Sequence, residues 1–539
     1  MSAPQTIIYL CSGVEFSNSY EHTRYFNSAT EQLMYFQNLS KFTLTANAYC
    51  RKNWNLRIAK PFEDCVNLNY AVFKNNGRWW FYFITNIQYV GEVTTEVTLE
   101  LDVMQTYHFD YELLPCFVER EHVSDDTIGA NVIEEGLDVG DLINVGYSQY
   151  DMTDLCVMIL SSVDLCYDTF NKLGTANRLI DNVYSGLGVF VVDAPAVTLS
   201  AVMHTLIDNL DTAGKTDAIV AMWMFPKEFV ELGEMPSGSG NRNNYIFPIK
   251  CAKTKNIEVL RPTSLGQLHY VPKNNKMLCY PYAFVHASNN NGSNAIYKYE
   301  RSTMTDISGN MAFIMYASVL PDGGVKLIPQ YYNGVVENWE ESINLNGFPV
   351  CAWNSDIYKI WLAQNEHSQN LALATSGLTI AGGLISAVGG VFTGNIAGVA
   401  GGVGTMINGG TQIAGIMAQR ADKEVLPPQA KGQSIGNVNI TGDHFTFSFY
   451  HKTVDNEHAI KIDRYLSAYG YKVNAFKVPE RTSRLNWNHV KTVSCKISGS
   501  ICTEDAEKIE AIYNKGVTFW HAGTKICDYS NYSNPIKGG

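Results

Sequence analysis

The chain has 539 residues, with 40 Lys and Arg residues against 52 Asp and Glu residues, and its formal net charge is -12. This acidic balance argues against a protein that holds nucleic acid by neutralising phosphates, because such proteins carry clustered Lys and Arg. The length allows several domains, each with its own hydrophobic core.

The N-terminus shows no basic stretch followed by a long apolar run, so we expect no signal peptide and folding in a cytosol. The 12 cysteines are scattered and form no Cys-x-x-Cys pair. We therefore expect reduced structural cysteines instead of a zinc knuckle or a redox dithiol.

A long β-hairpin is predicted between residues 78 and 103. Residues 93–103 alternate between apolar and polar side chains, which is typical of a strand with one buried face. The apolar face comprises Val93, Val97, Leu99, Leu101 and Val103. The opposite face comprises Thr94, Glu96, Thr98, Glu100 and Asp102. Residues 78–90 are expected to form the partner strand across Gly91 and Glu92.

Residues 151–349 are predicted to form a mixed α/β domain with a helix over 195–210 and a buried strand over 218–226. Beyond residue 420 the pattern again favours strands, because apolar residues alternate at Phe445, Phe447 and Phe449 and at Val493, Cys495 and Ile497. Residues 503–516 predict a short helix with Thr503 as its N-cap and Gly516 after its last turn.

One stretch imitates a phosphate-binding loop. Gly214, Lys215 and Thr216 resemble the end of a Walker A motif, but Asn209 stands where its first glycine belongs. The predicted order is also helix, loop, strand, whereas the motif needs strand, loop, helix. A surface turn is therefore favoured over a nucleotide site.

A second stretch resembles a metal site, because Glu119, Glu121 and His122 are close in sequence. In a strand the two glutamates share one face and His122 lies on the other, so a solvated or inter-subunit salt-bridge face is favoured. The chain also lacks a GxSxG motif. We predict no catalytic residue, no cofactor and no metal site, and we do not expect an enzyme.

Residues 368–419 contain no Asp, Glu, Lys, Arg or His. About fifty uncharged residues suffice for two helical passes through a bilayer and a turn. About a quarter of them are glycine, which disfavours an isolated soluble helix. Small residues recur at every fourth position, at Gly382, Ser386, Gly390, Gly394, Gly398 and Gly402 and, after Met406, at Gly410.

Such a stripe of small residues lets helix backbones approach closely in lipid. We therefore predict a membrane-active hairpin with both ends on one side of the bilayer, and the alternative is a buried hairpin in the core of a soluble oligomer. The residues expected to act in the membrane are Leu384, Ile385, Val388, Gly390, Val391, Phe392, Gly394, Ile396, Gly398, Val399, Gly402, Val403 and Ile407.

Several stretches resemble, in matching order, the distal tail-tube (tail-knob) proteins of small podoviruses of Gram-positive hosts, the phi twenty-nine kind. These stretches are residues 16–36, 99–107, 117–141, 353–368 and 463–492. The resemblance implies a mainly β fold with β-barrel tube domains, assembled as a hexameric ring at the tail tip. It also implies partners: other tail proteins, host membrane lipids, and double-stranded DNA in transient passage.

By position, the resemblance places a plug and pore-forming loop at residues 368–419. Its stems contain Trp361, Gln364 and Asn365 before the loop, and Pro427 and Pro428 after it. The expected domains are 1–150, an N-terminal β tube domain; 151–349, a peripheral α/β domain; 350–367, the first stem; 368–419, the loop; and 420–539, a C-terminal β tube domain.

Two functions remain open from the sequence. The first is a conduit for the phage genome whose loop plugs the tube and then penetrates the host membrane, with Glu96, Glu100 and Asp102 lining the bore. A negative bore would repel phosphates, although an outward solvated face explains these carboxylates equally well. The second is a receptor-binding or cell-wall-engaging tail module whose apolar loop is only oligomer core.

Overall fold

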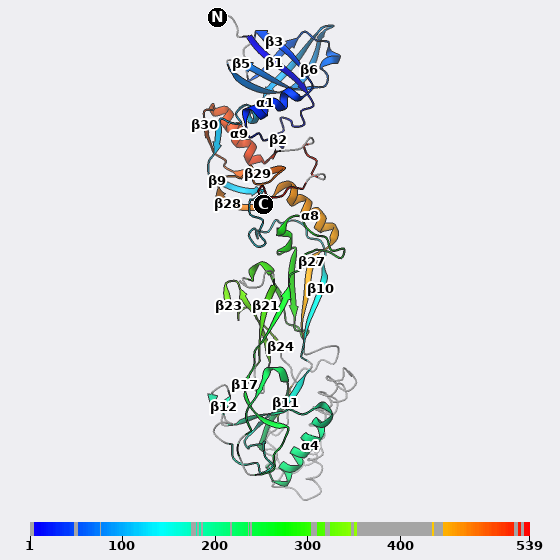
Figure 1. The fold of residues 1–539 in the computed structure, drawn as a ribbon, viewed down its shortest axis with the longest axis vertical. Helices are drawn as coiled ribbons and strands as arrows, with labels where there is room; N and C mark the ends of the chain where they lie inside the picture. The colour runs from blue at the N-terminus through cyan, green and yellow to red at the C-terminus, as the bar shows by residue number, and fades with distance from the viewer. Residues whose placement is uncertain are drawn as a thin grey trace, which may run out of the picture. The chain divides into compact units, whose positions relative to one another are not determined.

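The protein is represented by a computed structural model, which is mainly β with few helices (Figure 1). The structure describes residues 5–47, 52–75, 77–152, 154–173, 179–180, 183–184, 187–215, 218–235, 237, 240–302, 310–317, 324–345, 350–352, 434–435, 446–521, 526–529 and 533–538. Ten of the cysteines among them carry free thiols.

The chain forms two compact units, and neither is continuous in sequence. Unit 1 contains Met1–Ile143, Thr263–Ala283 and Thr453–Gly539, and unit 2 contains Asn144–Pro262 and Phe284–Lys452. The N-terminal and C-terminal parts, which we expected as separate domains, therefore belong to one unit. The reason is strand pairing between them, which sequence periodicity does not reveal.

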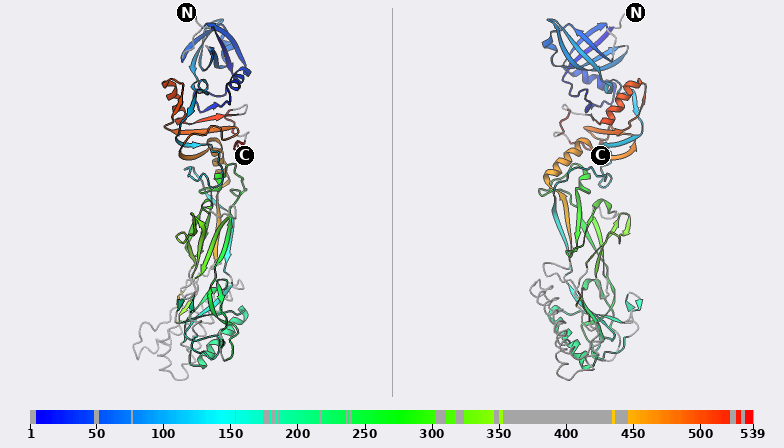
Figure 2. Two further views of the ribbon diagram at one scale, coloured as in Figure 1. Left: turned by 60° about the vertical axis from the view of Figure 1, so that its left-hand side comes forward. Right: turned by 180° about the vertical axis from the view of Figure 1, so that it is seen from behind.

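The first sheet of unit 1 has six strands in the order β3-β1-β5-β6-β7-β4. The strands are β1 (Gln5–Ser12), β3 (Lys41–Asn47), β4 (Asn53–Ile58), β5 (Leu68–Asn75), β6 (Arg78–Gly91) and β7 (Thr94–Leu101). Figure 2 shows this sheet, coloured blue, curving strongly. Among the described residues, β3 and β4 are the two edge strands of this sheet and do not pair with each other. The closed β-barrel expected from the resemblance is therefore not found within one chain.

The predicted hairpin is β6 and β7, which pair antiparallel. Along β7 the buried residues are Thr95, Val97, Leu99 and Leu101, and the residues between them are partly exposed, so the predicted alternation is confirmed for the strand itself. The prediction is wrong for Val93, which is 67% exposed because it lies in the turn before β7 begins.

The second sheet of unit 1 joins the two ends of the chain. Its order is β2-β31-β29-β9-β28, with β2 (His22–Arg24), β9 (Cys116–Glu121), β28 (Tyr471–Lys477), β29 (Trp487–Val493) and β31 (Val517–Trp520). A short pair, β8 (Tyr111–Leu113) and β30 (Ile497–Gly499), adds a further link between them.

The helices of unit 1 are α1 (Ala29–Asn38), α2 (Phe62–Cys65), α3 (Val103–Thr106), α8 (Asn456–Tyr469), α9 (Thr503–Lys515) and the 3-10 turn η4 (Asn275–Leu278). Helix α9 confirms the predicted helix, except that its N-cap is Cys502 instead of Thr503. Gly516 ends it with a φ of 102°, a conformation that favours glycine.

The strand expected to continue from Val493 to Ile497 is broken. Ser494 has a φ of 59°, so β29 ends at Val493 and the chain turns before β30. The Cys495 amide donates to Asn514 Oδ1 at 2.9 Å instead of to a neighbouring strand. The apolar alternation of Val493, Cys495 and Ile497 therefore does not mark one continuous strand. The backbone conformation at Ser494 divides it between β29 and β30.

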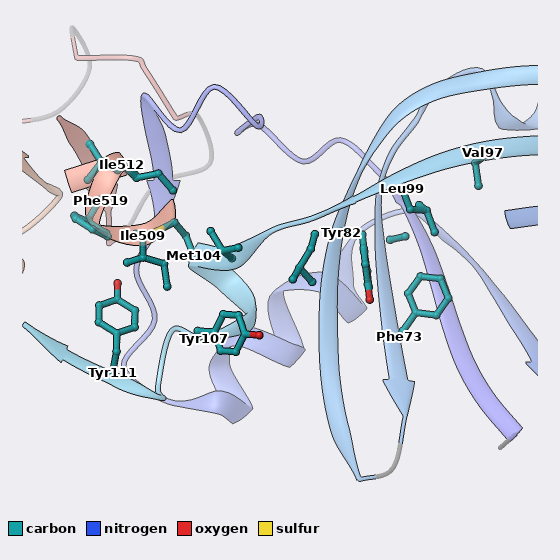
Figure 3. Close-up of a cluster of buried hydrophobic side chains, with 14 of the residues drawn as sticks. Phe73, Tyr82, Val97, Leu99, Met104, Tyr107, Tyr111, Ile509, Ile512 and Phe519 are labelled. Atoms are coloured by element: carbon teal, nitrogen blue, oxygen red, sulfur yellow. The ribbon is translucent and has the colours of Figure 1, made fainter. Parts of the chain in front are cut away.

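One hydrophobic core holds the two sheets of unit 1 together (Figure 3). Phe73, Tyr82, Val97 and Leu99 belong to the six-stranded sheet, and Ile509, Ile512 and Phe519 belong to α9 and β31. Met104, Tyr107 and Tyr111 lie between these two groups. Burial of large apolar side chains is the main stabilising contribution to such a core.

Unit 2 contains a seven-stranded sheet in the order β16-β17-β14-β11-β15-β25-β26. Its strands are β11 (Leu155–Ser161), β14 (Gly188–Val192), β15 (Ile219–Pro226), β16 (Val230–Leu232), β17 (Ile246–Ala252), β25 (Val350–Ala352) and β26 (Ser434–Ile435). Helix α4 (Ala196–Thr212), with Pro195 as N-cap, and the buried strand β15 confirm two predicted elements.

Two further sheets belong mostly to unit 2. The four-stranded sheet β10-β27-β19-β20 contains β10 (Leu142–Asp151), β19 (Ala283–Ser288), β20 (Asn294–Tyr297) and β27 (Thr446–Val454). The five-stranded sheet contains β18 (Lys255–Leu260), β21 (Asn310–Ala317), β22 (Val325–Tyr332), β23 (Val335–Glu337) and β24 (Ile343–Leu345).

The remaining short elements of unit 2 are the pair β12 (Leu179–Ile180) and β13 (Val183–Tyr184) and the 3-10 turns η3 (Lys227–Phe229) and η5 (Tyr299–Arg301). On β27, Phe447 and Phe449 are buried, as their alternation predicts, whereas Phe445 lies outside the described residues.

Candidate functional site

The apolar segment 368–419, with all thirteen residues predicted to act in a membrane, lies outside the described residues. The same holds for the stem residues Trp361, Gln364, Asn365, Pro427 and Pro428. What the structure shows is the strand on either side. In the pair β25 and β26, Val350 lies opposite Ile435 and Cys351 lies opposite Ser434. The chain therefore leaves the seven-stranded sheet and returns to it at neighbouring strands.

Two of the three predicted bore carboxylates share one face of β7. Glu96 accepts hydrogen bonds from Arg57 Nε at 2.7 Å and from Asn55 Nδ2 at 3.0 Å, both on β4. The bond from Arg57 lowers the pKa of Glu96. Glu100 accepts a hydrogen bond from Asn18 Nδ2 at 2.8 Å. This face therefore carries one carboxylate paired with a cation and one hydrogen-bonded to an amide.

The third predicted bore carboxylate, Asp102, does not lie on that face. Its side chain is fully buried, because β7 ends at Leu101 and the chain turns into α3. Asp102 caps α3 by accepting from the Gln105 amide at 3.1 Å, and it accepts from the Tyr70 hydroxyl at 2.8 Å. Burial raises its pKa to about 7. The prediction that Asp102 faces a water-filled bore is wrong.

Residues 119–122, which resembled a metal site, make contacts within unit 1 instead. Glu119 pairs with Lys491 at 2.9 Å and Glu121 pairs with Lys477 at 2.6 Å, and Glu121 is fully buried. His122 is also buried: it accepts from the His489 amide at 2.8 Å, and its Nε2 lies 3.0 Å from the Ser467 carbonyl oxygen. The expected solvated face is therefore wrong for Glu121, whose partner comes from the same chain.

Within the described part of the chain, no group of His, Cys, Asp and Glu side chains could hold a metal ion. The segment that imitated a phosphate loop follows α4 and precedes β15, in the order that the sequence predicted. Lys215 Nζ donates to the Phe170 carbonyl oxygen at 2.6 Å, so its ammonium group is used within the fold. Among the helices that the structure describes, none is long and apolar enough to cross a membrane.

A buried ionic cluster in unit 1 has no counterpart in the sequence predictions. The fully buried carboxylate of Glu135 pairs with both Arg120 and Lys276, and it accepts from the Lys472 amide at 2.9 Å. Its cationic partners lie 15 and 141 residues away in the chain. Because a buried carboxylate needs such compensation, the cluster fixes the segment after β9 against β28 and η4.

A neighbouring polar cluster centres on Asp463 of α8, which is also buried. It accepts from the Tyr270 hydroxyl at 2.7 Å, from the Lys273 amide at 2.9 Å and from Asn274 Nδ2 at 2.7 Å. Asp463 thereby holds the segment 270–274 against α8. No local sequence pattern marks these residues, since their partners are distant in the chain.

Comparison with known proteins identifies the family. A family model described as Bacillus phage phi29, tail knob protein gp9, C-terminal domain, matches residues 248–534, which is more than half of the chain. A second model, described as the caudoviral major tail protein N-terminus, matches residues 4–112.

Full-length relatives agree with these models. The tail knob protein gp9 of Bacillus phage B103 is 25% identical and covers 97% of this chain and 98% of its own length. The corresponding protein of Bacillus phage phi29 is 23% identical, with 98% of both chains covered. The fold is similar to that of the bacteriophage C1 tail knob protein gp12, with a TM-score of 0.68 at 16% identity, covering 99% of this chain and 100% of that one.

These relatives are structural components of phage tails and not enzymes, which agrees with the absence of a catalytic motif from the sequence. The resemblance seen in the sequence is thus confirmed over nearly the whole length of the chain. The protein is a virion tail component, and it belongs to the family of the phi29 tail knob protein gp9.

Proposed function

We propose that copies of this tail knob protein form a tube, a hexameric ring, at the tail tip that conducts the genome. In this proposal the segment 368–419 plugs the tube in the intact virion and enters the host cell membrane during infection, where it forms a pore. Membership of the tail knob family supports the structural part of the proposal.

The observation that carries the membrane part is the pairing of β25 with β26 around an uncharged segment. Ala352 and Ser434 end and begin neighbouring strands, so the chain between them, which contains the segment, leaves and returns at one place on the protein. Absence of charge over residues 368–419 removes the main cost of entering hydrocarbon. The length allows two passes, and the glycine stripe allows close packing of helices in lipid.

For the bore we retain Glu96 and Glu100 and exclude the buried Asp102. Each copy in a ring would contribute one carboxylate that is not paired with a cation. Together these carboxylates would give a negative potential that repels DNA phosphates. Arg57 reduces this potential at Glu96, so Glu100 is the main contributor on this face.

Leakage from vesicles tests the membrane part. A peptide spanning Asn370–Ala418 is added to vesicles of phosphatidylglycerol and cardiolipin that contain a self-quenching dye, and we expect rapid release. The matched control peptide carries Ile396→Asp and Val399→Asp, because each central carboxylate opposes insertion by about 3 kcal/mol.

Release by the parent peptide and not by the control supports the proposal. A parent peptide that is inert in all lipid compositions and at all pH values would favour the alternative, a receptor-binding or wall-engaging module with an apolar oligomer core. Ring formation is tested separately by the mass of the purified protein in solution and by the symmetry of its projection images.

A further inference from the structure

A pocket of about 660 Å³ lies in unit 1, and none of the residues assigned above to the tube or the membrane lines it. Its wall includes His122 and residues 124–127 after β9, residues 273–275, the start of β29, and residues 533–536 near the C-terminus. The last segment is fixed by backbone hydrogen bonds of 3.0 Å from the Leu485 amide to the Pro535 carbonyl and of 2.8 Å from the Lys537 amide to the Ser483 carbonyl.

Arg484 lines this pocket, and its side chain has unused donor capacity. The residue is only 6% exposed, yet its Nε–H has no hydrogen-bond partner, and no carboxylate of the described chain lies within ion-pair distance of its guanidinium. Its position is fixed through the backbone, where its amide donates to Asn488 Oδ1 at 3.0 Å. Enclosed donors of this kind are rare, because an unmade hydrogen bond is costly in a buried place.

Carboxylates lie in the wall of the same pocket. Asp125 is exposed and accepts from the Thr127 amide at 2.8 Å. Asp126 accepts from the Tyr471 hydroxyl and from the Asn275 amide. The pocket therefore offers acceptors as well as the Arg484 donor.

The formal charges of the lining residues cancel. Arg484 and the exposed Lys273 carry formal positive charges, and Asp125 and Asp126 carry formal negative charges, although burial raises the pKa of Asp126. His122 is neutral because burial lowers its pKa to about 3. A free anion in the pocket would meet the two carboxylates, and a cation would meet the two positive groups. A fitting ligand thus carries no net charge and both donates and accepts hydrogen bonds.

We propose that this pocket binds a sugar unit, an uncharged ring that carries several hydroxyl groups. Each hydroxyl donates one hydrogen bond and accepts others, so one hydroxyl can accept from the Arg484 guanidinium while its neighbour donates to a carboxylate. Tyr529, which is partly exposed, adds aromatic surface for the apolar edges of the ring. The volume lies within the usual range of small-ligand sites.

The proposal is independent of the membrane activity proposed above. In its test, the full chain is mixed with glucose, galactose, rhamnose, N-acetylglucosamine and N-acetylgalactosamine, and saturation transfer from protein to sugar protons is measured by NMR. We expect transfer to at least one of these sugars. Inorganic phosphate and ethanolamine serve as charged probes, and we expect neither to compete with that sugar.

Arg484→Gln should weaken sugar binding about tenfold, since one charge-assisted hydrogen bond is lost. The matched control Arg57→Gln changes an exposed arginine away from the pocket and should bind as the parent does. Ser533→Trp provides a second variant in case Arg484→Gln does not fold, because Ser533 is an exposed lining residue and the larger side chain fills the pocket.

Binding that both pocket variants reduce, with the Arg57 variant unchanged, supports a sugar site. The proposal is overturned if no neutral sugar shows transfer, or if transfer persists at parental strength in both pocket variants. Binding of inorganic phosphate that depends on Arg484 would also overturn it, because that result identifies an anion site.

Discussion

Val350 lies directly opposite Ile435 in the antiparallel pair β25 and β26, although the whole uncharged segment separates them in sequence. The pair closes the base of a long insertion, so the sheet does not require the inserted residues. Deleting residues 368–419 and bridging the ends with a few glycines should therefore leave folding and assembly intact. Circular dichroism and the mass in solution check this prediction.

A longer deletion that also removes Ser434 and Ile435 is the control, because it eliminates β26 and should lower the melting temperature. Aggregated or monomeric protein from the shorter deletion, under conditions in which the parent assembles, would show that the segment is core instead.

The glycine stripe permits a test of how the segment opens a membrane. Valine or leucine at Gly394 and Gly398 raises hydrophobicity but holds helix backbones apart, so partitioning into bilayers should persist while channel conductance falls. Val391→Leu and Val399→Leu, which lie off the stripe, should change conductance little. Planar bilayer recordings compare the two sets, and parental conductance in the glycine variants would exclude close glycine packing as the mechanism.

Charge reversal on β7 tests the bore. Glu96→Lys with Glu100→Lys adds cations beside Arg57, so the assembled protein should retain double-stranded DNA at low salt and release it as salt rises. As a control, Glu457→Lys with Glu504→Lys reverses two exposed carboxylates that already pair with lysines. Equal DNA retention by both double variants would argue that β7 does not line the path of the genome.

Glu135 is predicted to be important for the stability of unit 1. Glu135→Gln leaves Arg120 and Lys276 without their buried counter-charge, and we expect a loss of about 3 to 5 kcal/mol in the free energy of unfolding. Glu457→Gln breaks an exposed pair with Lys461 and should leave this free energy almost unchanged. Urea denaturation measures both, and similar effects of the two changes would contradict the assigned role of the cluster.

Asp102 should make stability depend on pH. Its pKa rises from 3.8 in the reference state to about 7 in the fold, so the folded protein binds this proton more tightly than the unfolded chain. The resulting stabilisation is fully present below about pH 4 and is lost as the pH rises through about 7. The change amounts to roughly 4 kcal/mol at most.

Melting temperatures of the parent and of Asp102→Asn at about pH 5 and about pH 8 check this prediction. The parent should lose stability relative to the variant as the pH rises. Asp125→Asn is the control: hydrogen bonding to Thr127 lowers the pKa of Asp125, so its contribution is already constant in this range. A parent and an Asp102 variant with parallel pH profiles would show that Asp102 keeps an ordinary pKa.

Several features follow from the sequence because they depend on neighbours along the chain. The alternation at Val97 and Leu99 identifies β7, and helical spacing with a terminal glycine identifies α9. The uncharged segment is a property of composition alone. The ordered resemblance of several stretches to tail knob proteins likewise needs no coordinates, and full-length relatives confirm it.

Tertiary structure decides what lies beside each element, and so it decides the state of individual polar groups. Asp102 continues the alternation of β7 in sequence, yet the turn into α3 encloses it against Tyr70. Glu135 meets Lys276, and Arg484 meets Ile536, only after strand pairing has joined distant parts of the chain. Periodicity reports which side of a strand faces a core, whereas burial, ionic compensation and pocket walls depend on contacts between segments far apart in sequence.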